Sequence, residues 1–237
     1  MQGNERSKQG KDAGAALEEE ALAQLYRERF QEGFLPRKRD IWRVLCQHFF
    51  QRYVAASDTV LDVACGYGEF INSIRCGRKL AADINPDTAQ HLDAGVELHA
   101  VAADRIASIG QESVDVVFTS NFLEHLENKA ALDQFLQQVM QVLKPGGRYL
   151  ILGPNLRYLP GAYWDFYDHH LGLTDQSLAE ALQLQGFTIE SKRAKFLPYT
   201  TQGKLPTHPL LVRLYLLLPM TWPLLGKQFF VVARKPD

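Results

Sequence analysis

A glycine-containing segment flanked by acids is the first place in this sequence where residue types and spacing suggest chemistry. Asp62 precedes the stretch 65–68 (Cys-Gly-Tyr-Gly), and Glu69 follows it directly. Glycines let the backbone turn tightly and approach a ligand closely. A P-loop requires Gly-Lys-Ser/Thr, and a dinucleotide fingerprint requires a third glycine where Ile71 stands. Because the carboxylates would repel a phosphate, the segment favours a positively charged ligand.

A further carboxylate, Asp83, ends the next apolar run. In nucleotide-binding α/β folds an acid at this position accepts hydrogen bonds from ribose hydroxyls. The alternative for Asp83 is an Asx turn before Pro86, although Asn85 already fills the capping role there. Together with the glycine segment, Asp83 predicts a site for a nucleoside that carries positive charge and no phosphate.

Histidines later in the chain are candidates for proton transfer, because imidazole titrates near neutral pH. His125 is expected to shape the cofactor pocket. His169 lies in a loop rich in aromatic residues, and we expect it to be the catalytic base, with Asp168 as its orienting partner. The alternative is a loop that only packs its aromatic rings onto the domain. No H-E-x-x-H or other ligand spacing is present in the sequence, so we expect no metal.

Alternating strand and helix signals position these residues. Apolar runs predict strands at 59–63, 80–84, 96–101, 114–118, 149–152, 187–196 and 228–233. Helical spacing predicts helices at 15–30, 41–49, 132–143 and 174–184, and Asn85-Pro86 predicts the start of another. This alternation favours a mostly parallel sheet with helices on both faces, which binds ligands at the carboxyl ends of its strands.

Composition excludes several broad classes of protein. The 237 residues are 46% apolar and 22% charged, as in an ordinary globular protein. A formal net charge of −1 leaves no basic footprint for nucleic acid. Three cysteines without CxxC spacing favour reduced thiols over a disulfide framework. Residues 1–14 are polar and lack the apolar region of a signal peptide. We therefore expect a cytoplasmic protein.

The C-terminal region combines basic and apolar character. Residues 191–237 contain eight Lys or Arg against one acid, Asp237, and include the most apolar stretch, 209–225. Pro219 and Pro223 interrupt this stretch, and it is shorter than the ~20 apolar residues of a bilayer span. Basic and apolar residues together suggest peripheral contact with the inner face of a membrane through 205–226, or a lid or oligomer contact. A core helix with solvated charges is the alternative.

Residues 60–68, Val-Leu-Asp-Val-Ala-Cys-Gly-Tyr-Gly, resemble the first motif of the class I S-adenosylmethionine-dependent methyltransferases, V-L-D-x-G-C-G-x-G, with Ala64 at one glycine position. Asp83, Asp104 with Arg105, the segment 118–126 and the Lys-Pro-Gly-Gly turn within 143–148 are similar to later motifs in family order. The resemblance implies an α/β, Rossmann-like seven-stranded sheet with an antiparallel last strand, and S-adenosyl-L-methionine as cofactor. From residue 154 onward the chain resembles a bacterial subgroup that methylates surface glycans, glycolipids or secondary metabolites.

The resemblance, together with the aromatic loop, implies a set of site residues. The residues predicted to bind the cofactor are Asp62, Ala64, Cys65, Gly66, Tyr67, Gly68, Asp83, Ile84, Asp104, Arg105, Asn121, Phe122 and His125. The residues predicted to bind the substrate are Asn155, Tyr163, Trp164, Tyr167 and His170. The predicted catalytic residues are His169 and Asp168.

We expect a polar tail over 1–14 and one methyltransferase domain over 15–237, with a helical cap at 15–56, a cofactor-binding core at 57–153 and acceptor-side elements at 154–237. The expected reaction methylates a hydroxyl, or another O, N or C nucleophile, of a small molecule, a sugar or a lipid-linked glycan. The alternatives are a non-catalytic S-adenosylmethionine-binding scaffold or membrane-associated partner subunit, and an NAD-dependent oxidoreductase. The oligomeric state is left open.

Overall fold

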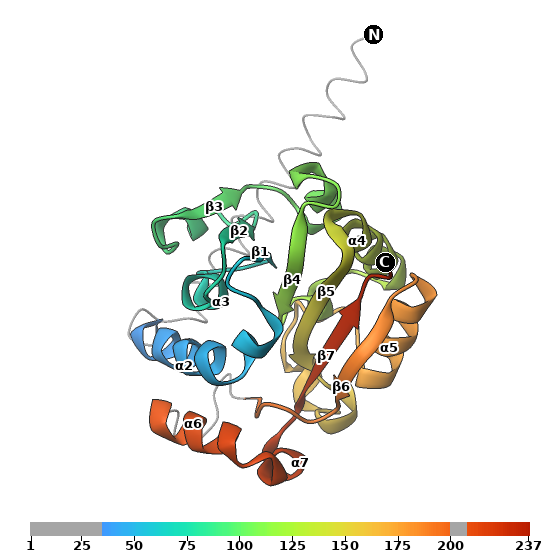
Figure 1. The fold of residues 1–237 in the computed structure, drawn as a ribbon. Helices are drawn as coiled ribbons and strands as arrows, with labels where there is room; N and C mark the ends of the chain where they lie inside the picture. Colours follow the sequence, from blue (N-terminus) through green and yellow to red (C-terminus); the bar gives the residue numbers. More distant parts are fainter. Residues whose placement is uncertain (1–34, 200–207) are drawn as a thin grey trace, which may run out of the picture.

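A seven-stranded sheet forms the centre of the molecule (Figure 1). The computed structural model describes residues 35–199 and 208–237. The sheet order is β3-β2-β1-β4-β5-β7-β6; β7 is antiparallel to both neighbours and the other pairs are parallel. This order confirms the predicted fold class. The strands are β1 (Thr59–Val63), β2 (Arg78–Ala82), β3 (Val96–His99), β4 (Val114–Ser120), β5 (Leu143–Pro154), β6 (Thr188–Arg193) and β7 (Gln228–Arg234).

Helices and short 3₁₀ turns connect the strands. Three of the described α-helices begin at side-chain caps: Asn128 accepts the Ala131 amide, Thr174 forms a capping box with Ser177, and His208 accepts the Leu210 amide. The α-helices are α2 (Leu35–His48), α3 (Glu69–Ser73), α4 (Lys129–Val142), α5 (Asp175–Leu184), α6 (Pro209–Leu217) and α7 (Trp222–Leu225). The 3₁₀ turns are η2 (Phe50–Tyr53), η3 (Thr88–Gln90), η4 (Ala103–Ile109), η5 (Leu123–His125), η6 (Leu156–Tyr158), η7 (Ala162–Asp165) and η8 (Pro219–Thr221).

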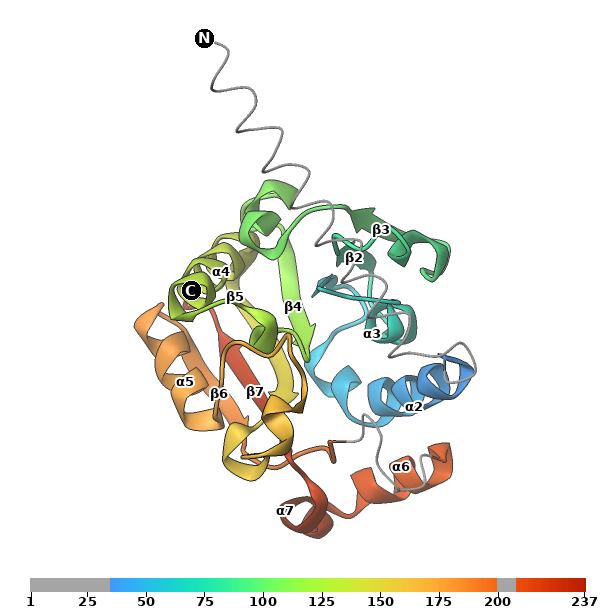
Figure 2. The ribbon, with the colours of Figure 1, turned by 180° about the vertical axis from the view of Figure 1, so that it is seen from behind.

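Side chains alternate between the two faces of the sheet, and each face has its own hydrophobic core. In β5, Tyr149 and Ile151 join the core that contains α4 and α5, whereas Leu150 and Leu152 join the core that contains α2, α3, α6 and α7. Figure 2 shows the molecule from behind, with α4 and α5 on one side of the view and α2 and α6 on the other.

Stacked aromatic rings tie the N-terminal helix to the C-terminal part of the chain. Phe49, the residue after α2, is buried and stacks on Phe196 with ring centroids 4.0 Å apart. In the same core, Phe70 of α3 stacks on Phe118 of β4 at 3.7 Å. In both views α2 and α6 lie side by side. The second core is therefore built from segments far apart in the sequence.

One predicted element is wrong. Asn85-Pro86 does not start a helix: only the single turn η3 (Thr88–Gln90) follows. The Asn85 side chain accepts the Asp87 amide at 2.9 Å, so it closes a local turn instead of capping a helix. The predicted strands 80–84 and 96–101 end at Ala82 and His99. The tail 1–14, the helix 15–30, the first part of the cap, and residues 205–207 of the apolar segment lie outside the described residues.

The aromatic core generates a stability prediction. Phe49→Ala should lower the free energy of unfolding by about 3–5 kcal/mol, because it removes a buried ring and leaves a cavity. Urea denaturation followed by circular dichroism measures the loss. Leu184→Ala is the control, since this α5 side chain is 84% exposed; its effect should stay within about 0.5 kcal/mol. Equal losses in the two variants would contradict the assigned core.

Candidate functional site

The loop after β1 places three residues in the left-handed conformation. Ala64, Gly66 and Gly68 have φ angles of +53°, +55° and +73°. An ideal Cβ built on Gly66 meets no atom within 4 Å, so open space lies beside this residue. A Cβ on Gly68 would come within 2.4 Å of Leu92 Cδ2. The loop therefore leaves room for a ligand at Gly66, and Ala64 carries a steric cost of about 1–2 kcal/mol where the motif has glycine.

Three carboxylates surround this loop. Asp62 and Glu69 are buried, and Asp83 is half-buried. Asp83 accepts hydrogen bonds from the amides of Gly66 (2.7 Å) and Asn85 (2.8 Å), one on each oxygen. Burial raises the pKa of Asp62 well above its usual range, and the charges of Glu69 and Asp83 raise it further. Burial also raises the pKa of Asp83, although the hydrogen bonds from the backbone amides of Gly66 and Asn85 act to lower it. Such a surplus of buried acid favours a cationic ligand.

Residues near the N-terminus of helix α2 contact this acidic loop. Lys38 Nζ lies 2.7 Å from Glu69 Oε1, and Arg39 Nη2 donates to the backbone oxygen of His91 at 3.3 Å. Tyr67 packs on the ring of His91 with centroids 4.1 Å apart. These contacts fix α2 against the residues that follow β1 and β2.

Other residues predicted to bind the cofactor line the rim of the sheet. Asp104 and Arg105 are exposed on η4, with Arg105 Nε 3.8 Å from Asp104 Oδ1, and they line an open hollow of about 470 Å³. Ile84 is 49% exposed. Asn121 is exposed after β4 with a φ of +49°, whereas Phe122 packs edge-on against the core. The predicted set thus follows the carboxyl ends of β1, β2, β3 and β4.

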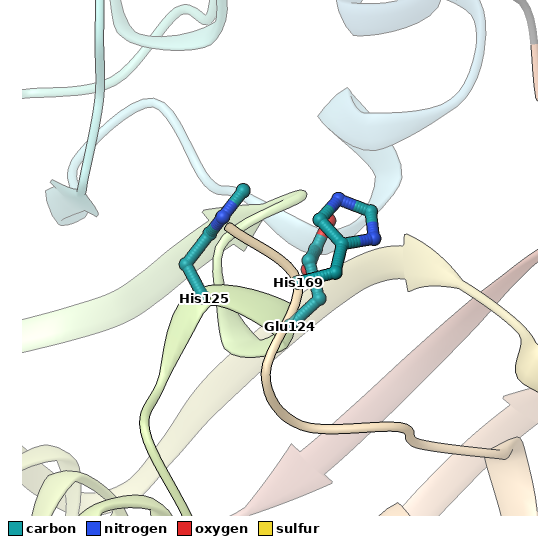
Figure 3. A group of neighbouring side chains, drawn as sticks. All are labelled: Glu124, His125 and His169. Atoms are coloured by element: carbon teal, nitrogen blue, oxygen red, sulfur yellow. The ribbon is translucent and has the colours of Figure 1, made fainter. Parts of the chain in front are cut away.

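Glu124, His125 and His169 form a second feature at this edge (Figure 3). One carboxylate oxygen and one nitrogen of each imidazole lie within 4.8 Å of one another. Glu124 and His125 are consecutive in η5, whereas His169 belongs to the loop between η7 and α5. The backbone oxygen of Glu124 accepts the amides of His170 (2.8 Å) and Leu171 (3.1 Å). These bonds hold the two segments together, and we call the three side chains the His–Glu cluster.

Each histidine of the cluster has its Nδ1 atom beside an oxygen. His169 Nδ1 lies 2.7 Å from the carbonyl oxygen of Tyr163. His125 Nδ1 lies 3.0 Å from the carbonyl oxygen and 3.2 Å from Oδ2 of Asp168. Because a carbonyl oxygen only accepts, Nδ1 carries the proton and Nε2 the lone pair in each neutral ring. Asp168 therefore orients His125, where the sequence prediction paired it with His169; the Tyr163 carbonyl takes that place.

The charges of the cluster are coupled. Burial raises the pKa of Glu124 to about 7, while nearby His125 opposes the shift. Burial alone would lower the pKa of His125, but Asp168 and Glu124 outweigh it and the pKa is raised. A buried carboxylate beside two imidazoles can hold a proton or a cation.

Part of the chain is similar in sequence to known proteins. Residues 61–151 match the family described as "Methyltransferase domain". This segment is similar to a methyltransferase domain. A Mycolicibacterium smegmatis protein named "Probable S-adenosylmethionine-dependent methyltransferase" is 29% identical over 147 residues, which cover 60% of this chain. The match spans only 56% of that relative.

Solved structures show the same fold. A SAM-dependent methyltransferase from Archaeoglobus fulgidus superimposes with a TM-score of 0.62 at 20% identity, covering 89% of this chain and 98% of that one. One from Methanosarcina mazei gives 0.58 at 18% identity, covering 79% and 96%. The predicted seven-stranded sheet with one antiparallel strand is confirmed, and the match over residues 61–151 agrees with the predicted resemblance to S-adenosylmethionine-dependent methyltransferases.

The residues predicted to bind the substrate divide into a buried group and an exposed group. Asn155 is buried and donates to Asp175 Oδ1 and the Ala194 oxygen, both at 2.9 Å. Tyr163 is buried, and its hydroxyl donates to the Leu171 oxygen. These hydrogen bonds hold the loop, and the predicted substrate contact of the two side chains stays a prediction. The roles of the exposed residues Trp164, Tyr167 and His170 stay predictions.

Sequence reasoning missed Glu124 as a member of the site. Its only signal is its position beside His125 after an apolar run. The burial of Glu124, and the approach of His169 from 45 residues further on, depend on the tertiary fold. The roles of His169 and Asp168 in catalysis stay predictions.

The acidic loop generates a prediction on pH. The folded state raises the pKa of Asp62, so the stability that this group contributes is present below the unfolded value of about 3.9 and is lost as pH rises toward the folded value. Asp62→Asn cannot ionise and should lose less stability between pH 5 and pH 8 than the unmodified chain. Urea denaturation across this range measures the slopes. Parallel curves would contradict the buried charge.

Proposed function

We propose that this protein transfers a methyl group from S-adenosylmethionine to a hydroxyl of a lipid-linked or glycolipid acceptor at a membrane surface. The observation that carries the proposal is the presence, at one edge of the sheet, of both an acid-lined glycine loop and the His–Glu cluster. The loop fits a cationic nucleoside, and the cluster fits an acceptor that must lose a proton.

The cofactor side rests on the loop after β1. S-adenosylmethionine supplies a methyl group attached to a positively charged sulfur. Gly66 provides the open space, and Asp62 and Glu69 provide negative charge for the ammonium and sulfonium groups. The Gly66 amide orients the Asp83 carboxylate, whose oxygens keep lone pairs for two ribose hydroxyls.

The acceptor side rests on the His–Glu cluster. A hydroxyl must lose its proton as its oxygen forms a bond to the methyl carbon, while the bond between that carbon and sulfur breaks. We assign the activation of the hydroxyl to the cluster, because Nε2 carries the lone pair in both neutral imidazoles. Alignment of the acceptor by the surrounding loop can contribute about 7–11 kcal/mol at best.

An exposed apolar surface supports a lipid-linked acceptor. It consists of eight large apolar side chains from α6, η8, α7 and the residue between α6 and η8, and Met220 and Leu224 are 79% and 81% exposed. Exposed patches of this kind mark interaction sites. No helix in the described ranges is long and apolar enough to cross a bilayer. The surface consists of Leu210, Leu211, Leu214, Leu217, Leu218, Met220, Leu224 and Leu225.

Basic residues accompany this apolar surface. Arg213 is exposed within α6, Lys227 is exposed just after α7, and Lys195 Nζ donates to the Pro223 oxygen at 2.8 Å. Residues 191–236 contain no acid. Apolar side chains with a basic surround fit the interface of an anionic bilayer. The Asn155 amide donates to the Lys227 oxygen at 3.0 Å, so α7 adjoins the end of β5 from which the loop of His169 departs.

A methylation assay tests the activity. With radiolabelled S-adenosylmethionine and bacterial membrane extracts, the protein should label the lipid-soluble fraction. His169→Ala should abolish labelling, while the affinity for S-adenosylhomocysteine, measured by calorimetry, should change less than about 3-fold, because His169 lies on the acceptor side. Full activity of the variant would remove the cluster from the mechanism. Cofactor binding without transfer to any fraction would favour the non-catalytic scaffold.

Flotation with vesicles tests the membrane contact. The protein should float with vesicles of phosphatidylcholine and phosphatidylglycerol, less with phosphatidylcholine alone, and less as salt rises. The double variant Leu217→Glu/Leu224→Glu should lose at least about 10-fold in binding, because each charge would enter the interface. Leu184→Glu, at an exposed site on α5, is the matched control. A dimer that the double variant dissociates, without flotation of the unmodified chain, would contradict a bilayer as the occupant.

A further inference from the structure

We propose that the His–Glu cluster of Glu124, His125 and His169 binds a divalent transition-metal ion of the zinc type. The binding site stands on the geometry alone, whereas its role in activating a hydroxyl rests on the proposed function. The inference departs from the sequence-based expectation of no metal, which relied on ligands close together in the sequence.

The ligand atoms come from two segments that are fastened to each other. One carboxylate oxygen and two imidazole nitrogens lie within 4.8 Å of one another. Bonds of about 2.0–2.2 Å from an ion to each would bring them somewhat closer together. Glu124 and His169 are buried and His125 is half-buried. The hydrogen bonds from the His170 and Leu171 amides to the Glu124 oxygen hold the segments at this spacing. Only a small inward movement of side chains is needed to complete the site.

The surroundings of the two imidazoles match those of metal ligands. A ligating histidine almost always donates its other ring N–H to a carboxylate or a backbone carbonyl, which fixes the ring and its tautomer. Here His125 Nδ1 lies at the Asp168 carboxylate and carbonyl, and His169 Nδ1 at the Tyr163 carbonyl. Both rings are thereby set to offer Nε2. Asp168 and the Tyr163 carbonyl thus fix the same tautomer in the two rings, independently of each other.

The donor set indicates the class of metal. Two imidazoles and one carboxylate suit Zn²⁺, Fe²⁺, Co²⁺ or Mn²⁺, whereas Mg²⁺ and Ca²⁺ prefer oxygen ligands. Three protein ligands leave at least one coordination position for a hydroxyl, as in catalytic zinc sites. An ion there would hold the acceptor oxygen and lower the pKa of its hydroxyl, so that the proton passes to water. His169 is then a ligand, and no histidine needs to act as the base.

Metal titration tests the site without an activity assay. After removal of metals with EDTA, the full chain should bind one equivalent of Zn²⁺ by isothermal titration calorimetry, and Zn²⁺ should raise its melting temperature. Glu124→Gln and His169→Asn should each weaken binding by at least about 100-fold. Asp168→Asn should weaken it by about 10–100-fold, because it removes the partner of a ligand. His170→Ala, at the exposed neighbouring histidine, should leave the affinity for Zn²⁺ unchanged.

A Co²⁺ spectrum excludes binding at cysteine. Cys46, Cys65 and Cys76 are free thiols, and a Co²⁺ adduct at the His–Glu cluster should show d–d bands without thiolate charge-transfer absorption. No stoichiometric binding, or equal affinity in the unmodified chain and the ligand variants, would overturn the site.

The metal site and the proposed function can fail separately. Methyl transfer that proceeds undiminished in EDTA, with no Zn²⁺ bound, would overturn the metal site and leave His169 as the predicted base. Stoichiometric Zn²⁺ binding without methyl transfer would support the site and overturn the proposed function.

Discussion

Buried negative charge at the carboxyl edge of the sheet is the constraint on which the rest of the structure depends. Asp62 and Glu69 are buried on either side of the glycine loop, and Asp83 lies against its backbone. Burial raises the pKa of Asp62 and of Asp83, so their ionised forms carry an electrostatic cost that a nearby positive charge would relieve. Lys38 at Glu69 provides part of this compensation within the chain. The same buried acids are the basis of the proposal that the loop binds a positively charged nucleoside.

The fold brings the acceptor side to this edge by joining distant segments. The β4 end carries Glu124 and His125, and the loop after β5 carries Asp168 and His169. Asn155 and Tyr163 are buried and bonded within that loop, which gives it a fixed path. The aromatic core around Phe49 then holds α2 beside α6, close to the apolar surface. Packing thus positions the glycine loop, the His–Glu cluster and the exposed apolar surface around one seven-stranded sheet.

Local patterns were sufficient to predict most of the strands and the acid-lined glycine loop. A strand, a glycine turn and an acid are defined by neighbouring residues, so Asp62, Gly66 and Asp83 could be found without the fold. The antiparallel position of β7 followed from the family resemblance, since no local signal sets strand order. The helix after Asn85 was predicted wrongly because the side chain of Asn85 serves a cap and an Asx turn equally well.

The acceptor side could be predicted only in part, because its contacts are long-range. The sequence pointed to His169 and Asp168, but their adjacency suggested a pair, whereas the fold directs Asp168 to His125 and the Tyr163 carbonyl to His169. Asn155 and Tyr163 have the residue types of substrate ligands, and only their burial shows their role in holding the loop. Glu124 illustrates the same limit. It is recognised as part of a cluster only because the fold brings His169 close to Glu124 and His125.

Paired calorimetric titrations of the full chain with S-adenosylmethionine and with NADH test the central claim most directly. An acid-lined loop should bind the cationic nucleoside with one-to-one stoichiometry and show no measurable heat with the pyrophosphate-bearing one, and Asp83→Ala should weaken the first by at least about 10-fold, the loss expected for a desolvated carboxylate that orients a ligand. Comparable binding of NADH, or S-adenosylmethionine binding that is indifferent to Asp83, would contradict the account.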